Sequence, residues 1–205
     1  MGTYREHVLP RLVDAACGTA ALAPLRARVC AGLGGHVVEI GFGSGRNVPF
    51  YPDGVTRVDA VEPADAAWRL AGARLAAAGV AVRRTGLDGQ RLPFGDGAFD
   101  QALSTWTLCT IPDPHAALSE LRRVLKPDGI LRFVEHGLAP DESVRRLQRR
   151  FEPAQRLLAG GCHLTRPVAA MLAAAGFDVV ELEEFYHPGA PRFESAFSLG
   201  LAASP

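Results

Sequence analysis

The pattern of apolar and polar positions along the chain predicts strands that alternate with helices. Short apolar runs are typical of buried strands, and apolar residues that recur at helical spacing follow most of them. The expected strands cover 37–40, 55–61, 80–84, 99–104, 130–134, 177–185 and 193–201, and the expected helices cover parts of 4–33, then 64–78, 114–125, 141–158 and 165–175. No helix separates the last two strands, so we expect them to pair antiparallel. This order predicts an α/β fold with a doubly wound, mostly parallel sheet and an antiparallel edge strand.

Prolines and one cap residue mark the expected helix ends. Pro63 suits the first position of one helix, Asp113 is expected to cap another, and Pro153 is expected to break a third. Pro10 and Pro24 are expected to interrupt the N-terminal segment, which leaves room for short helices only. These helices could cover a ligand cleft or only the sheet.

The run from Val37 to Gly45 contains the most specific signal of a ligand site. An apolar strand meets Gly41, Gly43 and Gly45 at every second position. Glycine lets backbone N–H groups approach a ligand, and the N-terminus of a following helix favours negative charge. A dinucleotide-binding turn carries its third glycine one place later, and Glu39 would repel a pyrophosphate. The spacing therefore favours a ligand that carries a cationic amino group.

Polar residues at other expected strand ends extend this candidate site. Glu62 follows the second strand, where an acid in dinucleotide folds receives ribose hydroxyls, although a solvated acid is the alternative. Asp88 lies in the loop after the third strand, and Thr105 and Trp106 follow the fourth. The carboxyl ends of parallel strands meet at one edge, so these residues are expected to lie together.

Two histidines are candidate proton-transfer groups. His136 follows the fifth strand together with Glu135, and His163 lies in a later loop that is expected to reach the same edge. Histidine changes its charge near neutral pH, so either could accept or orient a proton of a nucleophile. The alternative for each is a hydrogen-bonded structural role.

Composition narrows the partners. The chain has 205 residues, of which 48% are hydrophobic, and its formal net charge is +0. One domain with one core is expected, and the balanced charge gives no electrostatic argument for nucleic acid as a partner. The four cysteines, Cys17, Cys30, Cys109 and Cys162, lie far apart, so we expect no metal site and no disulfide framework.

The N-terminus indicates the compartment. Arg5, Glu6 and His7 stand where a signal peptide needs an apolar core, and no later stretch offers about eighteen uninterrupted apolar residues. We therefore expect a soluble protein without a transmembrane segment, and the scattered cysteines favour a reducing cytoplasm as its location.

A basic cluster lies on the helix expected over 141–158. Arg145, Arg146, Arg149 and Arg150 share one face of it. Such a face could contact the phosphate head groups of a lipid surface, or it could simply be solvated. Peripheral lipid contact is therefore one of two interpretations, and the sequence does not indicate an oligomeric state.

At the glycine motif the sequence resembles the class I S-adenosylmethionine-dependent methyltransferases, of the type 11 kind. Their first motif is Glu/Asp-x-Gly-x-Gly-x-Gly, and the resemblance extends over residues 30–202. The segments 37–51, 108–109, 121–127, 135–136 and 161–166 look like those of soluble bacterial relatives of the methyltransferase-like thiol methyltransferases. The animal members of that group carry an N-terminal membrane anchor, which we expect this protein to lack.

The resemblance implies a Rossmann-like seven-stranded sheet and S-adenosylmethionine as the cofactor. Glu39 would hold the amino end of the cofactor, Glu62 its ribose, and either Leu87 or Asp88 its adenine. The implied cofactor-binding residues are Glu39, Gly41, Gly43, Gly45, Asn47, Glu62, Pro63, Leu87, Asp88 and Thr105, and the candidate catalytic residues are His136, His163 and Glu135.

The expected function is methyl transfer to a small-molecule acceptor by in-line displacement. The acceptor could be a thiol, an amine, a hydroxyl or a lipid head group. Two alternatives remain open, a nicotinamide-dependent oxidoreductase and a protein that binds S-adenosylmethionine without catalysis. We expect a single domain with a helical cap (1–33), a cofactor-binding core (34–136), a helical substrate-side segment (137–176) and a terminal strand hairpin (177–205).

Overall fold

The computed structural model describes Tyr4 and residues 8–205. Arg5, Glu6 and His7 lie outside the described residues. The helices are α1 (Leu9–Cys17), α2 (Ala23–Cys30), α3 (Asp65–Leu70), α4 (Gly72–Ala76), α5 (Pro114–Val124), α6 (Glu142–Leu158) and α7 (Val168–Ala174), with 3-10 turns at Ala20–Leu22 and Val48–Phe50. The strands are β1 (Gly35–Ile40), β2 (Val55–Val61), β3 (Ala81–Gly86), β4 (Phe99–Thr105), β5 (Leu125–His136), β6 (Asp178–Tyr186) and β7 (Ala196–Ala203).

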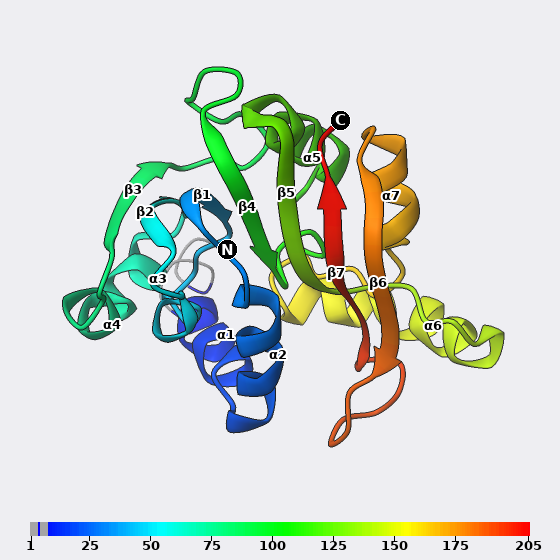
Figure 1. Ribbon diagram of the computed structural model, residues 1–205. Helices are drawn as coiled ribbons and strands as arrows, with labels where there is room; N and C mark the ends of the chain where they lie inside the picture. Colours follow the sequence, from blue (N-terminus) through cyan, green and yellow to red (C-terminus); the bar gives the residue numbers. More distant parts are fainter. Residues whose placement is uncertain (1–3, 5–7) are drawn as a thin grey trace.

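The strands form a seven-stranded sheet in the order β3-β2-β1-β4-β5-β7-β6 (Figure 1). β1 to β5 pair in parallel, whereas β7 pairs antiparallel with both β5 and β6. The predicted fold class is confirmed, and so is the antiparallel pairing of the last two strands. The reversed strand is β7, and β6 forms the edge beyond it. The strand order reverses direction between β1 and β4, which is where open α/β sheets bind ligands.

Both faces of the central strands of the sheet are buried. On one face Val38, Ile40 and Phe133 pack with residues of α5 and α7. On the other face Val37 and Val134 pack with residues of α2. Neighbouring positions of one strand thus serve opposite layers, which is why these strands read as continuous apolar runs.

The helix before β3 differs from the prediction. We expected one helix over 64–78 with Pro63 at its first position, but α3 begins at Asp65, and Ala64 is its cap. The chain turns at Ala71, and α4 begins at Gly72. Glycine lowers helix stability by about 1 kcal/mol relative to alanine, which favours a break at this point.

Other boundaries also moved. Pro10 and Pro24 do not interrupt the N-terminal helices but lie in the first turns of α1 and α2, where proline loses no intrahelical hydrogen bond. β5 begins at Leu125 rather than at residue 130, because Leu125 already pairs with Phe99 of β4, ahead of an irregularity after which Ile130 pairs with Gln101.

The prediction that Pro153 breaks the helix over 141–158 is wrong. α6 continues through Pro153 to Leu158. Glu152, one residue earlier, accepts hydrogen bonds from the Thr165 hydroxyl and, at 3.0 Å, from His163 Nδ1. These tertiary contacts hold the turn that contains the proline.

The cap of α5 gives a test of the fold. Asp113 Oδ1 accepts from the backbone N–H groups of His115 and Ala116, both at 3.0 Å. We expect Asp113→Ala to lower the free energy of unfolding in urea by about 1 kcal/mol, because two N–H groups lose their acceptor. Asp113→Ser keeps an accepting oxygen and serves as the control. Equal losses in the two variants would contradict the capping role.

Candidate functional site

The glycine turn after β1 depends on backbone conformations that favour glycine. Gly41, Gly43 and Gly45 have φ angles of 64°, 59° and 73°. A Cβ at Gly41 would lie 2.0 Å from Thr107 Oγ1, whereas a Cβ at Gly43 would meet only the Gly41 carbonyl oxygen, at 3.8 Å. Gly43 therefore presents open backbone at the carboxyl edge of the sheet.

A helix does not follow this turn. The 3-10 turn Val48–Phe50 is the regular element that comes next, and β2 follows it. The expectation that a helix N-terminus contributes favourable charge here is therefore wrong. Pro49 and Pro52 explain the short element, because neither supplies a backbone N–H for a longer helix.

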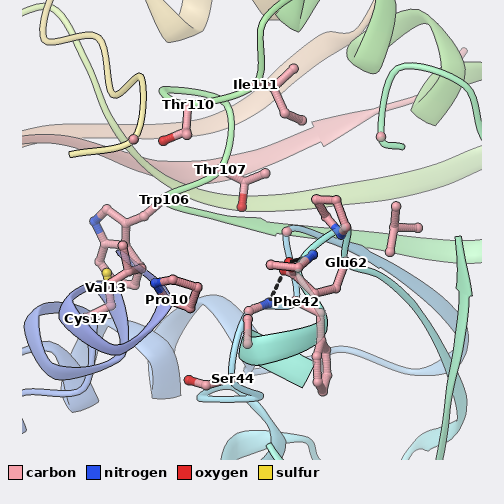
Figure 2. A pocket seen from close by; sticks show the side chains of 18 of the residues that line it. Pro10, Val13, Cys17, Phe42, Ser44, Glu62, Trp106, Thr107, Thr110 and Ile111 are labelled. Carbon is pink, nitrogen blue, oxygen red and sulfur yellow. Dashed lines mark hydrogen bonds between the residues drawn. The ribbon is translucent and has the colours of Figure 1, made fainter. Parts of the chain in front are cut away.

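A cavity of about 540 Å³ lies at this edge (Figure 2). Its volume falls in the range of roughly 300–1,000 Å³ that is usual for small-molecule sites. Among the residues proposed from sequence, Gly41, Gly43, Glu62, Pro63, Leu87, Asp88 and Thr105 line it. Figure 2 shows Pro10, Val13, Cys17 and Trp106 together at one side and Glu62 at the other. The cavity thus has a β2 side and an α1 side.

Glu62 lies at the β2 side. Its carboxylate accepts from the backbone N–H groups of Gly43 and Ala64, both at 2.7 Å. Burial raises the pKa of Glu62, and the two backbone donors oppose that rise. Ile40 pairs with Val61, so Glu39 and Glu62 leave the sheet at the same end.

The Leu87–Asp88 pair lies in the loop after β3. Both residues line the cavity, so the question of which one meets adenine stays open. Asp88 Oδ1 accepts from Gln90 N at 2.9 Å and from Gln90 Nε2 at 3.0 Å, and these hydrogen bonds lower the pKa of Asp88. The loop therefore holds an ionised carboxylate at the cavity.

Glu39 lies behind the cavity wall, not at its surface. Its carboxylate accepts from Asn47 Nδ2 at 3.0 Å and from the Tyr51 hydroxyl, and it is not among the lining residues. Asn47 also donates to Thr105 Oγ1 at 3.0 Å and accepts from Arg26 Nη1 at 2.6 Å. We define these five residues as the buried network. In this geometry Glu39 therefore makes no direct contact with the amino group of a ligand in the cavity.

The sequence left open whether the N-terminal helices cover a ligand cleft or only the sheet, and it did not indicate the contacts of Asp14 and Arg26. Asp14 of α1 accepts from Arg46 Nε at 2.7 Å and from the Ser44 hydroxyl, which ties the helix to the glycine turn. Arg26 of α2 donates to the Cys17 carbonyl oxygen at 2.8 Å. Of the two alternatives, α1 covers the cavity, whereas α2 packs on the sheet and adds only Arg26 to the cavity. The available signal was Asp14, the one acidic residue of α1.

Trp106 joins the cavity to the core. It has a φ of 50°, lies under the Arg26 guanidinium at 4.7 Å, and meets Phe197 edge to face at 5.7 Å. Its Nε1 is buried and has no hydrogen-bond partner among the described residues. A bulky residue in the left-handed region is unusual, and such strain is most often found at functional sites.

The candidate catalytic residues lie outside the cavity lining. Glu135 is fully buried and accepts from Ser104 Oγ at 2.6 Å and from Thr107 N at 2.9 Å. His136 faces Cys162 Sγ at 3.6 Å, and His163 faces Glu152. The geometry brings Glu135 to the loop that follows β4 but brings neither histidine to the cavity.

The chain is similar to known methyltransferases. The Methyltransferase domain family matches residues 38–133. The thiol S-methyltransferase TMT1B of Rattus norvegicus is 33% identical over 155 residues, which span 72% of this chain and 62% of that protein. The malonyl-[acyl-carrier protein] O-methyltransferase of Geobacter sulfurreducens is 35% identical over 117 residues, 52% of this chain and 43% of that protein.

A solved structure has the same fold. The 1,6-didemethyltoxoflavin-N1-methyltransferase of Burkholderia thailandensis, with bound S-adenosylhomocysteine, matches with a TM-score of 0.68 and 22% identity, over 93% of this chain and 80% of that one. The sheet order is that of a Rossmann-like methyltransferase fold, and residues 38–133, which run from β1 into β5, resemble a Methyltransferase domain. The chain spans less than two thirds of the length of the curated thiol S-methyltransferases that it matches. No helix in the described part of the chain is long and apolar enough to span a bilayer.

The buried carboxylates predict a pH dependence of stability. Burial raises the pKa of Glu39 and of Glu135 from 4.5 to about 7. Between these values the folded chain holds protons that the unfolded chain has lost, so stability falls as the pH rises. We expect the free energy of unfolding to fall from pH 5 to pH 7, by at most about 1.4 kcal/mol per pH unit for each group.

Glu39→Gln should reduce this slope, because it removes one of the two groups. The slope is measured by urea unfolding at several pH values between 5 and 7. Glu142→Gln is the control, because the pKa of Glu142 is lowered by Arg149 and lies below this window. An unchanged slope in Glu39→Gln would contradict the prediction.

Proposed function

We propose that the protein transfers the methyl group of S-adenosylmethionine to a small-molecule acceptor, and that a thiol is the acceptor the cavity suits best. The observation that carries the proposal is a cavity with Glu62 and open glycine backbone at one side and an apolar wall with a buried guanidinium at the other.

The residues at the β2 side fit the cofactor. A Cβ at Gly43 would point into open space, so a ligand can approach the backbone there. Glu62 can accept from the ribose hydroxyls, and Leu87 with Asp88 can take the adenine. In this proposal Glu39 and Asn47 hold Thr105 in position at the cavity instead of touching the cofactor.

The α1 side favours a thiol acceptor. Bound S-adenosylmethionine supplies an activated methyl group and a neutral leaving group, so the protein needs to orient a nucleophile and exclude water. No histidine is among the described residues that line the cavity, and Asp14 is already paired with Arg46. A thiol with a pKa of about 8.5 forms some thiolate at neutral pH without a protein base. The guanidinium of Arg26 would stabilise that thiolate.

The names of the relatives support methyl transfer as the shared reaction. The rat protein is named a thiol S-methyltransferase, the Geobacter protein an O-methyltransferase and the Burkholderia protein an N-methyltransferase. Their names differ in the acceptor atom and agree in the transferred group. A cytoplasmic location and the domain limits given above stay predictions.

Glu62 provides the first test. We expect Glu62→Gln to weaken the binding of S-adenosylhomocysteine at least about tenfold in calorimetric titration, because a buried charged acceptor is lost. Asp65→Asn is the matched control, since Asp65 is exposed, pairs with Arg84 and does not line the cavity. Equal affinities for wild type and Glu62→Gln, with both folded in urea titrations, would overturn the cofactor assignment.

Val13 provides the second test. Val13 lines the α1 side of the cavity, so we expect Val13→Trp to lower kcat/KM for thiophenol and alkyl thiols about tenfold or more by steric exclusion. Affinity for S-adenosylhomocysteine should stay within about twofold, because the β2 side is unchanged. Leu12→Trp, on the same helix and outside the lining, is the control.

The binding and turnover assays together also distinguish an enzyme from a binding protein, and a thiol acceptor from other acceptors. Cofactor binding without turnover of any thiol, amine or hydroxyl acceptor would favour a binding protein over an enzyme. Turnover with amines alone would reject the thiol and leave methyl transfer standing.

A further inference from the structure

Large exposed apolar side chains gather on α1, on the residue before it, and on α6. They are Val8 (42% exposed), Leu12 (53%), Val13 (44%), Leu147 (45%), Phe151 (42%), Leu157 (70%) and Leu158 (66%). We call these seven residues the docking face. Scattered exposed apolar residues are usual in proteins, but a cluster on adjoining helices indicates an interaction surface.

The segment around α1 meets the C-terminal end of α6 and the loop after it at the cavity. Tyr4, before α1, donates from its hydroxyl to the Leu158 carbonyl oxygen at 2.8 Å. A Cβ at Gly160 would lie 2.6 Å from Leu9, and both residues line the cavity. Val13 belongs both to the cavity lining and to the docking face. Figure 1 shows that α6 lies at the end of the sheet where β4 ends.

The distribution of residues around α6 is that of a helix at an interface. Val144 and Gln148 face the protein and are buried. Leu147, Phe151 and Leu158 are spaced by four and seven residues and form an exposed stripe beside that buried side. On the outer side of the stripe the helix carries arginines, among them Arg146 and Arg150. A helix with apolar and arginine-rich faces side by side suits the boundary between lipid and water.

The charge on α6 is largely uncompensated. Glu142 lies 3.9 Å from Arg145, 4.0 Å from Arg146 and 2.6 Å from Arg149, so a single carboxylate serves three guanidinium groups. Glu152, the other acid of the helix, is bound to His163 and Thr165. Arg150 and Arg156 have no carboxylate partner among the described residues. The chain as a whole has a formal net charge of +0, so this excess is local.

We propose that the docking face binds the surface of an anionic lipid bilayer, with its apolar side chains in the head-group region and the α6 arginines on the lipid phosphates. A second copy of the chain is a poorer occupant. In a twofold interface the arginine-rich helix would meet itself or lie beside itself, and like charges would repel.

This location has a consequence for the acceptor, and that consequence alone rests on the proposed function. The α1 side of the cavity borders the docking face through Val13, Leu9 and Gly160. On a bilayer, that side of the cavity lies next to the lipid. An apolar acceptor dissolved in the membrane could then enter without crossing water.

Co-sedimentation of the full chain with vesicles tests the docking. The probes are vesicles of phosphatidylcholine alone and of phosphatidylcholine mixed with phosphatidylglycerol. The wild-type protein should sediment with the mixed vesicles, less with the neutral ones, and less at high salt, because exposed charges are screened. Equal sedimentation with both kinds of vesicle, or none with either, would overturn the proposal.

Two pairs of variants locate the contact. Leu157→Ser and Leu158→Ser should each weaken vesicle binding at least about tenfold. Val180→Ser, at an exposed apolar residue on β6, should leave vesicle binding unchanged. Arg146→Gln and Arg150→Gln should each weaken binding about fivefold, whereas Arg83→Gln on β3 should not. If the control variants lost binding equally, vesicle contact would not be specific to this face.

Measurements of self-association and of cofactor binding distinguish lipid docking from dimerisation and from a failure of the proposed function. Self-association that Leu157→Ser and Leu158→Ser abolish, without vesicle binding, would assign the face to a second copy and reject the lipid proposal. S-adenosylhomocysteine titration of the same variants should match wild type, because none of these residues lines the cavity. Failure of cofactor binding in the wild type would therefore count against the proposed function and not against the docking face.

Discussion

The site depends on the hydrogen bonds of the buried network. Asn47 binds Glu39, Thr105 and Arg26 at once, and so joins β1, the end of β4, and α2. Asn47 and Glu39 are each 1% exposed. A polar group left there without a hydrogen-bond partner would destabilise the fold by roughly 3 kcal/mol or more. The network therefore fixes where the glycine turn stands relative to the opposite wall of the cavity.

A second buried carboxylate shapes that opposite wall. Glu135, at the end of β5, accepts from Ser104 Oγ and from the backbone N–H groups of Thr107 and Leu108. These bonds hold the loop in which Trp106 adopts a positive φ. Glu39 and Glu135 thus act through the segments they position. Each carboxyl group is tolerated in the interior because it accepts several hydrogen bonds, and burial nevertheless raises its pKa to about 7.

The cavity joins a part built by the sheet to a part built by surface helices. The β2 side comes from strand ends and tight turns, whose geometry the sheet fixes. The α1 side comes from short helices and from the loop after α6, which can change without altering the sheet. Relatives whose names give different acceptor atoms match this chain, and the proposed division of the cavity would account for that. The exposed Val13 of α1 lines the same end of the cavity.

Local patterns in the sequence determined the strands, the glycine turn, the cap at Asp113 and the position of Glu62, because each depends on neighbours within a few residues or on the common edge of parallel strands. Only the tertiary structure decided that Glu39 faces Asn47, that the histidines lie away from the cavity and that the apolar stripe of α6 stays exposed. Sequence periodicity shows which residues share a face of a helix. What covers that face, and which polar group a buried side chain meets, depends on segments far away in the chain.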